Sequence, residues 1–262
     1  GGPTGVELAG AIAEMKSHML PGDYKELNLN KMQVHLFEAS GNLLGPMSKD
    51  SQKRAVEYLD KFGVNIHLNT AVKSYTKGQL VYGEDESLMT ETVIWTAGVK
   101  GAYLPGLPQD VYLPNSRIKV NEFNEIGGLA DVYAIGDIAS MSLEDFPRGH
   151  PMVAPVAIQQ GELLAKNIMK KINNAPLEAF KYFDKGSMAT VGRNKAVVDF
   201  PGGKIKLGGF FAFMAWMFVH LMSLVGFRNK LIVLTGWLYN YMNYDRVLRL
   251  IIRPSKTRNT NI

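Results

Sequence analysis

The sequence predicts an α/β protein that is followed by a helical region of different character. Most of the chain alternates short runs of β-branched and aromatic residues with amphipathic segments. The clearest example is a strand pattern at 32–40 followed by a helix pattern at 48–62, with Ser48 as N-cap and Gly63 as the stop signal. From residue 209 onward the chain is dominated by apolar and aromatic residues.

Composition narrows the class of protein. The 262 residues are 46% hydrophobic and 20% charged, which is typical of a folded chain with one large domain or two ordinary ones. Twenty-nine Lys and Arg face 24 Asp and Glu, and this mild, dispersed excess predicts no nucleic-acid partner. The chain has no Cys, which excludes disulfides, thiolate catalysis and Cys-bound metal, and agrees with a reducing compartment. We expect no metal site.

Local patterns predict further elements in chain order. A helix is expected over 3–19, with Pro21 and Gly22 ending it. The other expected elements are strands within 64–83, 90–98, 117–121 and 131–137, a helix over 153–172 with Pro155 in its first turn, and a hairpin over 185–209.

The first residues, GGPTGVELAGAIAE, read as a glycine-rich loop that enters a helix. If one more glycine precedes residue 1, Gly2 and Gly5 take the second and third places of a G-x-G-x-x-G fingerprint. The N–H groups of residues 3–6 would then face a diphosphate at the positive end of the helix. The alternative is an ordinary glycine turn before a helix.

Glu38 strengthens the dinucleotide interpretation. It ends the next predicted strand, where an acid can bind both hydroxyls of an adenosine ribose. Because a carboxylate repels a 2′-phosphate, the ligand is expected to be NADH rather than NADPH. The alternative is a solvated carboxylate at the end of a strand.

The stretch VYAIGDIAS predicts a second ligand edge. A buried strand from Val132 to Ile135 would carry Gly136 and Asp137 to its carboxyl end, where Asp can accept a hydrogen bond from a ribityl hydroxyl. A simple Gly-Asp turn is the alternative.

The stretch VAPVAIQQG predicts that the next helix begins at this edge. Its first-turn N–H groups, on Val156 and Ala157, would be free to face the N1–O2 edge of a flavin. Gln159 and Gln160 indicate a polar site, and the alternative is a helix end capped by water.

The ordered stretches GGPTGVELAGAIAE, HLFEAS, VIWTAGVKG, VYAIGDIAS and VAPVAIQQGELLAKNI resemble the type II NADH dehydrogenases, which are flavoproteins that reduce quinone. The resemblance implies a Rossmann-like fold with two dinucleotide-binding domains, FAD and NADH as cofactors, and C-terminal amphipathic helices that anchor the protein to a membrane. It suggests an NADH-binding domain over 1–98, the C-terminal part of an FAD-binding domain over 99–180, and a hairpin with membrane-associated helices over 181–262.

The resemblance also implies site residues. Those expected at NADH are Gly2, Pro3, Thr4, Gly5, Glu38, Ala97 and Gly98, and those at FAD are Gly136, Asp137, Val156 and Ala157. Many members carry A-Q-x-A-x-Q, whereas Pro155 stands here in place of the first Gln. Catalytic roles on the quinone side therefore fall to Gln159 and Glu7, although the helix dipole alone would also favour Glu7.

The family's first segment, with its FAD-specific glycine loop, is expected to precede residue 1. On this hypothesis the chain is truncated at its N-terminus, binds FAD poorly and is inactive alone. In the full-length form, hydride would pass from NADH to FAD and two electrons to quinone. The alternatives are another FAD-dependent pyridine nucleotide oxidoreductase, or a silent NADH-binding fragment. Lack of Cys argues against a sulfide:quinone oxidoreductase, and the apolar C-terminal region argues against a soluble disulfide reductase.

The apolar stretch 209–227 is about as long as a membrane-spanning helix. Its aromatic residues are spread along it, however, and the segments 231–244 and 245–254 carry interfacial Trp, Tyr and Arg. We therefore expect two or three helices lying on the lipid bilayer surface, at the cytoplasmic face of a bacterial inner membrane. The alternatives are a single span, the mitochondrial inner membrane, or a helix buried in a homodimer.

Overall fold

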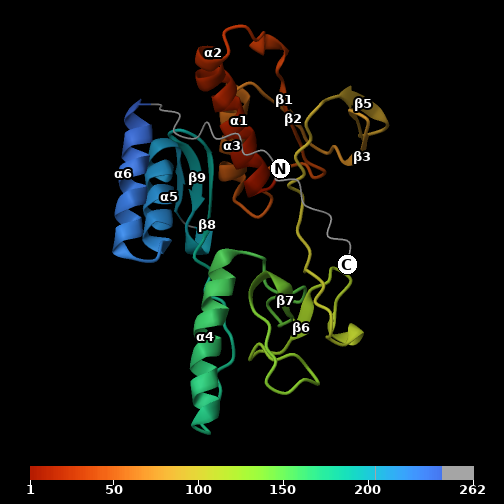
Figure 1. Ribbon diagram of the computed structural model, residues 1–262, viewed down its shortest axis with the longest axis vertical. Helices are drawn as coiled ribbons and strands as arrows, with labels where there is room; N and C mark the ends of the chain where they lie inside the picture. Colours follow the sequence, from red (N-terminus) through yellow and green to blue (C-terminus); the bar gives the residue numbers. More distant parts are fainter. Residues whose placement is uncertain (204, 244–262) are drawn as a thin grey trace, which may run out of the picture. The chain divides into compact units, whose positions relative to one another are not determined.

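The computed structural model describes residues 1–203 and 205–243, which form two compact units (Figure 1). Among the described residues, unit 1 comprises 1–93, 188–199 and 205–243, and unit 2 comprises 94–187 and 200–203. The domain limits at residues 98 and 180 remain predictions about function.

Unit 1 begins with a long helical segment. Helix α1 (Pro3–Glu14) starts at the N-cap Gly2, and Pro3 occupies the first turn, where its missing N–H has no helical partner to lose. The segment continues as a π-helix, η1 (Met15–Met19), and then as α2 (Leu20–Asp23). The predicted stop at Pro21 was therefore wrong, because Pro21 lies at the start of α2, where proline is tolerated.

The predicted strand–helix–strand unit is confirmed. Strand β1 (Val34–Phe37) pairs in parallel with β2 (Val64–His67), and α3 (Lys49–Lys61) connects them. The Ser48 side chain accepts a hydrogen bond from the Ser51 N–H, and Gly63 has a φ of 73°, which suits glycine after a helix. A three-stranded meander then follows, formed by β3 (Val72–Thr76), β4 (Gln79–Tyr82) and β5 (Glu86–Met89).

The predicted hairpin is also confirmed, with one further strand. Strands β8 (Ser187–Gly192), β9 (Lys195–Asp199) and β10 (Lys206–Gly208) form an antiparallel sheet in the order β10-β9-β8. Ala189, Val191 and Val197 of this sheet belong to the main core of unit 1. They join apolar residues of α1 and α3 there: Val6, Ala9, Ala13, Ala55 and Leu59. The core thus depends on segments that are far apart in the sequence.

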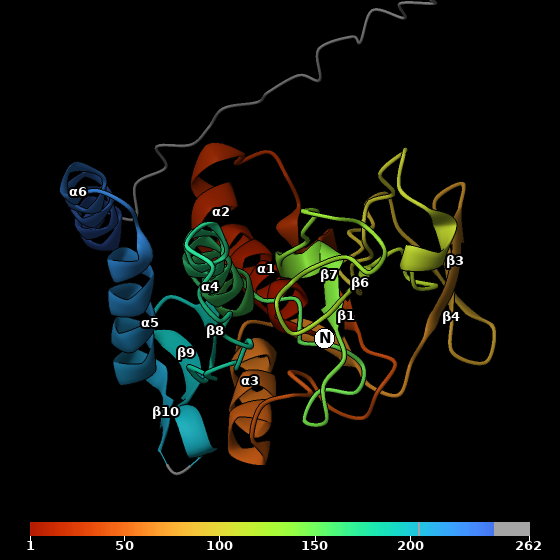
Figure 2. The same ribbon diagram turned by 90° about the horizontal axis from the view of Figure 1, so that it is seen from below.

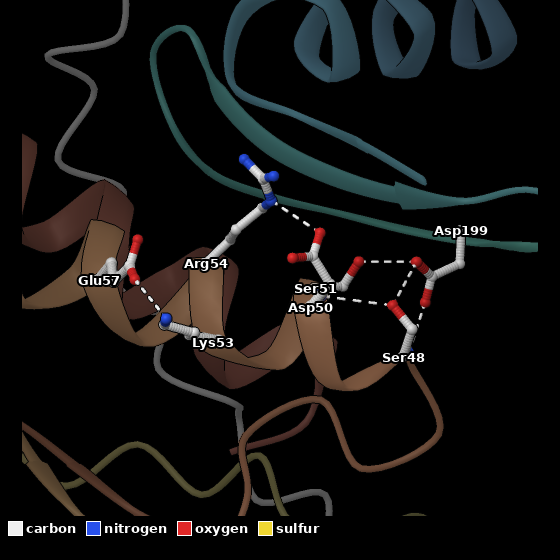
Figure 3. Close-up of polar contacts among 7 residues, drawn as sticks. All are labelled: Ser48, Asp50, Ser51, Lys53, Arg54, Glu57 and Asp199. Carbon is white, nitrogen blue, oxygen red and sulfur yellow. Dashed lines mark hydrogen bonds and ion pairs between the residues drawn. The ribbon is translucent and has the colours of Figure 1, made fainter. Parts of the chain in front are cut away.

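Asp199 ties the end of β9 to the start of α3 (Figure 3). Its carboxylate accepts hydrogen bonds from the Ser48 N–H at 2.6 Å, the Ser48 hydroxyl at 2.9 Å and the Ser51 hydroxyl at 2.7 Å. The acid therefore satisfies donors at the N-terminus of α3 and offsets the helix dipole there.

Two helices complete the described part of unit 1. Helix α5 (Gly209–Ser223) lies against β9 and beside α6 (Phe227–Asn243) in both views (Figures 1 and 2). The stretch 209–227 is thus not one continuous helix. None of the helices within residues 1–203 and 205–243 has both the length and the apolar character to cross a bilayer. The predicted interfacial segment 245–254 lies outside the described residues.

Unit 2 contains little regular structure besides one long helix. Its elements are η3 (Gln109–Val111), β6 (Ile118–Val120), η4 (Gly136–Ile138), β7 (Ala139–Met141) and α4 (Ala154–Ile172), with β6 and β7 paired in parallel. Helix α4 begins within one residue of its predicted start, and Pro155 lies in its first turn as predicted.

Two predicted strands are wrong. Residues 92–98 and 131–135 form no ladder, although Tyr133 makes an isolated bridge to Glu125. Val132 and Ile135 are 36% and 37% exposed rather than buried. A strand persists only when a neighbour takes its backbone hydrogen bonds, and no described segment pairs along these residues.

Candidate functional site

The structure brings the glycine-rich start of the chain to Glu38. The Gly1 backbone nitrogen lies 2.9 Å from Glu38 Oε2, and the Gly1 carbonyl accepts a hydrogen bond from the Leu44 N–H at 2.8 Å. A Cβ on Gly1 would lie only 2.6 Å from Glu38 Oε2, so glycine permits this approach. The loop and the acid therefore share one corner at the carboxyl end of β1.

The start of α1 offers fewer free donors than predicted. Pro3 has no N–H, and the Val6 N–H donates to the Gly2 carbonyl at 3.0 Å. No side chain caps this end of the helix. The expected set of donors over residues 3–6 thus narrows to the N–H groups of Thr4 and Gly5, which lie outside the helical ladder.

Contacts around Glu38 keep its carboxylate charged. Oε1 accepts a hydrogen bond from the Ser40 N–H at 2.8 Å. Burial alone would raise the pKa of Glu38, but hydrogen bonds, first among them that from the Ser40 N–H, outweigh it, and the net pKa is lowered. Glu38 is therefore ionised at neutral pH and can accept hydrogen bonds from hydroxyl groups.

Glu7 makes a contact within unit 1 that the sequence did not reveal. Its Oε1 accepts hydrogen bonds from the Thr190 N–H at 3.1 Å and the Thr190 hydroxyl at 3.3 Å. The carboxylate thereby joins α1 to β8. Gln159, which was predicted to share the catalytic role with Glu7, belongs to unit 2.

In unit 2, Gly136 and Asp137 lie on the turn η4. Gly136 has a φ of 71°, and a Cβ there would lie 3.3 Å from the Ala157 Cβ, so glycine lets α4 come close to the turn. The Gly136 N–H donates to Gln160 Oε1 at 2.7 Å, and Gln160 is only 1% exposed. Gln160 thus fixes the turn that presents the exposed Asp137, a role that sequence reasoning missed.

The first turn of α4 corrects another expectation. The Val156 and Ala157 N–H groups both donate to the Val153 carbonyl, at 3.1 and 3.4 Å, so they are not free. Because Pro155 lacks an N–H, the donor left outside the helical ladder in this turn is that of Ala154. The Val153 carbonyl thus takes both N–H groups that were expected to be free to face a flavin.

Gln159 is held by the backbone of Phe183. Its Nε2 donates to the Phe183 carbonyl at 3.0 Å, and its Oε1 accepts from the Phe183 N–H at 2.9 Å. Ala97 and Gly98 also belong to unit 2, in a segment without regular structure where Gly98 has a φ of 77°. The residues predicted for NADH are therefore divided between the two units.

A group of buried polar side chains lies in unit 2. Arg117 donates to the carbonyls of Ala139 and His150, but its Nε, the Ser140 hydroxyl and both His150 ring nitrogens have no partner among the described residues. Burial lowers the pKa of Arg117, and the Asp137 carboxylate acts in the opposite direction. Burial, and then the Arg117 charge, lower the pKa of His150, which is therefore neutral. Buried polar atoms of this kind normally have partners.

The chain matches two family models. Residues 1–161, more than half of the chain, match the pyridine nucleotide-disulphide oxidoreductase model, and residues 185–243 match the model of the NDH2 C-terminal domain. The chain belongs to the pyridine nucleotide-disulphide oxidoreductases, and its C-terminal part is similar to that of NDH2 proteins. The family resemblance that the sequence motifs indicated is confirmed.

Curated relatives agree with this family. The chain is 33% identical over 256 residues to the type II NADH:quinone oxidoreductase Ndh of Mycobacterium tuberculosis, covering 94% of this chain and 54% of that protein. It is 28% identical to an internal alternative NAD(P)H-ubiquinone oxidoreductase of Arabidopsis thaliana mitochondria, covering 92% and 50% of the two chains. The chain thus spans about half the length of the curated relatives it matches.

Solved structures share its fold. NDH2 of Plasmodium falciparum in complex with NADH matches with a TM-score of 0.80 at 18% identity, over 96% of this chain and 66% of that one. A sulfide:quinone oxidoreductase of Aquifex aeolicus matches with a TM-score of 0.61 at 16% identity, over 91% and 54%. These matches support the predicted α/β dinucleotide-binding flavoprotein fold.

Proposed function

We propose that this chain takes part in hydride transfer from NADH to FAD and in the onward transfer of two electrons to a membrane quinone. The observation that carries the proposal is the ionised Glu38 at the same corner as the glycine-rich start of α1. The curated relatives named as quinone oxidoreductases, and the related NDH2 bound to NADH, support it.

The NADH side follows from the chemistry of this corner. The N–H groups of Thr4 and Gly5 point along the positive end of α1, where a diphosphate is favoured. A Cβ on Gly2 would meet nothing within 4 Å, so the loop surface is open to a ligand. Glu38 would accept hydrogen bonds from the two ribose hydroxyls and repel a 2′-phosphate.

The residues of unit 2 fit a flavin. Asp137 is exposed on a turn that Gln160 holds, and the nearby buried atoms of Arg117 and Ser140 lack partners. Bound FAD would supply the two-electron chemistry that links a nicotinamide to a quinone. Asp137 would accept a hydrogen bond from a ribityl hydroxyl, and the N-terminus of α4, with the Ala154 N–H, would stabilise negative charge.

Gln159 and Glu7 remain the proposed residues on the quinone side. Each is already hydrogen-bonded, Gln159 to Phe183 and Glu7 to Thr190. A direct role requires that these contacts open when substrate binds. Otherwise the two side chains act by positioning α4 and α1.

The outer faces of α5 and α6 support peripheral attachment to a lipid surface. Large apolar side chains are exposed there: Phe211, Met214, Phe218, Met222, Phe227, Leu231, Leu238 and Met242. Such faces bind at the level of the lipid headgroups, where a lipid-dissolved quinone is available. We propose a bacterial inner membrane as the host membrane, with the mitochondrial inner membrane as the alternative. The competing explanation for these apolar faces is that they form the contact of a homodimer.

Replacing Glu38 tests the proposal. In Glu38→Gln we expect the preference for NADH over NADPH to weaken by about tenfold, because one charge repulsion of about 1.4 kcal/mol is lost. Nucleotide affinities would be measured by titration calorimetry. Glu57→Gln is the matched control, since Glu57 is an exposed carboxylate on α3. Unchanged discrimination in Glu38→Gln would remove Glu38 from the ribose site.

Adding FAD separates the enzyme from a nucleotide-binding module. Retained flavin absorbance that NADH bleaches would support the oxidoreductase. NADH binding without retained flavin would favour a nucleotide-binding module without enzymatic activity. The chain matches only about half of each curated relative, which is the reason for including this alternative in the test.

A further inference from the structure

Leu44 has a backbone conformation that leucine rarely adopts. Its φ is 51°, in the left-handed region where a Cβ crowds the backbone and where glycine, Asn and Asp are the usual residues. Within the described part of the chain, every other non-glycine residue with a positive φ is polar or charged. Backbone strain of this kind persists only where the surrounding contacts enforce it, and it is frequent at ligand-binding sites.

Contacts with the core and with α3 enforce this conformation. The Leu44 side chain is fully buried in the main core of unit 1. The Leu44 carbonyl accepts a hydrogen bond from the Met47 N–H at 2.8 Å, which closes a turn over residues 44–47. The buried Gln52 side chain, on α3, donates to the Gly45 carbonyl at 3.0 Å and to the Met47 carbonyl at 2.9 Å. The turn is therefore fixed from two sides.

This fixed turn contacts the glycine-rich start of the chain. The Leu44 N–H donates to the Gly1 carbonyl at 2.8 Å. Leu43 lies against the same residue, because a Cβ on Gly1 would lie only 2.7 Å from Leu43 Cδ2. The Gly1 backbone nitrogen in turn lies 2.9 Å from Glu38 Oε2. The turn therefore reaches the corner that we propose for NADH through Gly1.

The hydrogen bond from Leu44 also sets the direction of the next N–H group. The described residues contain no cis peptide bond, and the C=O and N–H of a trans peptide point in opposite directions. Because the Gly1 carbonyl is turned toward Leu44, the Gly2 N–H points away from it. Gly2 is exposed, and its N–H has no partner in the part of the chain that the structure describes. Gly2 thus adds a third free donor to those of Thr4 and Gly5 at the positive end of α1.

We infer that Leu44 is a positioning residue for the dinucleotide. Its left-handed conformation holds the Gly1–Gly2 peptide so that the Gly2 N–H faces the diphosphate of NADH together with the other free donors of α1. Because the Leu44 side chain is fully buried, Leu44 acts through Gly1 and not by touching the nucleotide. This inference rests on the proposed function, which supplies the NADH.

The competing explanation is that Leu44 only packs the core. The two roles use different groups of the same residue, since packing uses the side chain and positioning uses the N–H. Experiments that change one group at a time therefore separate them.

Removing the Leu44 N–H tests the positioning role. Leucic acid, the α-hydroxy analogue of leucine, placed at position 44 by nonsense suppression, replaces the N–H with an ester oxygen and keeps the side chain. The Kd for NADH, measured by titration calorimetry, should rise about tenfold for the loss of one hydrogen bond of about 1.4 kcal/mol. An unchanged Kd would overturn the inference.

The same ester at Leu27 is the matched control. The Leu27 N–H also donates to a backbone carbonyl, that of Tyr24 at 3.2 Å, and Leu27 is 52% exposed in a loop of unit 1. This ester should leave the Kd for NADH unchanged. An equal rise in the two esters would show a general effect of the ester and would contradict the role of Leu44.

Shorter ligands identify the part of the nucleotide that is affected. ADP carries the diphosphate, whereas adenosine carries only the base and the ribose. In the Leu44 ester, the Kd for ADP should rise as much as that for NADH, and the Kd for adenosine should stay the same. Equal losses for ADP and adenosine would indicate a general distortion of the corner and would overturn the positioning role.

Leu44→Gly makes the opposite change. It keeps the N–H and removes the side chain, and glycine adopts a φ of 51° without strain. Urea unfolding should show a larger loss of stability than in the Leu44 ester, whereas the Kd for NADH should rise less. Packing alone predicts the same order of the two variants in both measurements, and that outcome would contradict the inference.

The native chain separates the two hypotheses. If it binds neither NADH nor ADP, the proposed function fails and the role of Leu44 fails with it. If it binds both ligands and the Leu44 ester binds them equally well, the role of Leu44 alone fails.

Discussion

The two units of this molecule satisfy their buried polar groups to different extents. In unit 1, which has one large apolar core, the buried Asp199 and Ser51 side chains hydrogen-bond each other, and among the described residues Gln52 Oε1 alone is a buried side-chain atom without a partner. Unit 2 has smaller apolar clusters, and buried atoms of Arg117, Ser140 and His150 lack partners among the described residues. Because an unpaired buried polar atom destabilises a fold by about 1–3 kcal/mol, unit 2 has much to gain from a bound group.

This difference indicates which half depends on a ligand. Unit 1 closes its core with its own segments, and the corner at Gly1 and Glu38 that we propose for NADH lies outside that core. Unit 2 has buried polar atoms without hydrogen-bond partners close to the turn at Gly136 and Asp137. We therefore expect substitutions in unit 1 to change chain stability directly, and substitutions in unit 2 to act mainly through FAD.

The largest effect is expected at the contact between α1 and β8. A Cβ on Gly10 would lie 1.7 Å from the Val191 carbonyl oxygen, so Gly10→Ala should lower the free energy of unfolding by at least about 3 kcal/mol. In Gly161→Ala, on α4, the Cβ would meet only Ile135 Cδ1 at 3.6 Å, and a gain of about 1 kcal/mol is expected from helix propensity. Urea unfolding measures both. An increased free energy of unfolding in Gly10→Ala would contradict close packing between α1 and β8 in unit 1.

Removing the Asp199 carboxylate should have the next largest effect. Asp199→Ala deletes three hydrogen bonds at the start of α3, and a loss of about 2–4 kcal/mol is expected by the same measurement. Asp50→Ala is the control on the same helix (Figure 3). Asp50 bonds Arg54 in an exposed pair, so little change is expected. Equal losses in the two variants would show that the buried network adds nothing.

Gln160→Leu examines unit 2. The substitution leaves the Gly136 N–H without its acceptor, and FAD affinity should fall about tenfold for a loss of about 1.4 kcal/mol. Flavin fluorescence anisotropy would report the affinity. Gln109→Leu, at an exposed position in the same unit, should leave it unchanged. Unaltered FAD binding in Gln160→Leu would mean that the Gly136 turn does not hold the flavin.

The smallest effect concerns pH and returns to unit 1. The pKa of Glu38 is lowered, so its charge, and the contribution it makes to stability and NADH binding, is present above the ordinary carboxyl range. That contribution is lost only as pH falls through the lowered pKa. The difference in NADH affinity between the native chain and Glu38→Gln should therefore stay constant from about pH 8 to about pH 5. A difference that shrinks within this range would contradict the charged ribose contact.

Local signals could be predicted and distant contacts could not. Ser48 and Gly63 mark the ends of α3 because capping involves residues only a few positions away. The meeting of the glycine loop with Glu38 was predictable because both follow from one strand–helix–strand pattern. The bonds of Glu7 to Thr190 and of Gly136 to Gln160 depend on tertiary packing, which leaves no local pattern.

The wrong strands have the same physical origin. The apolar runs around Ile94 and Val132 have the composition of strands, but a strand also needs a partner. Composition therefore predicted the preference of these residues for an extended backbone, but not whether another strand would pair with them.

The discontinuity of unit 1 has a consequence for synthesis on the ribosome. The Glu7–Thr190 contact closes 183 positions and the Ser48–Asp199 contact closes 151, so the first ninety or so residues emerge long before the strands that complete their core. During that interval the nascent chain exposes the faces of α1 and α3 that β8 and β9 later cover. Translation speed and chaperone capture should therefore influence the yield of this half more than that of unit 2, whose contacts are formed almost entirely within one continuous stretch.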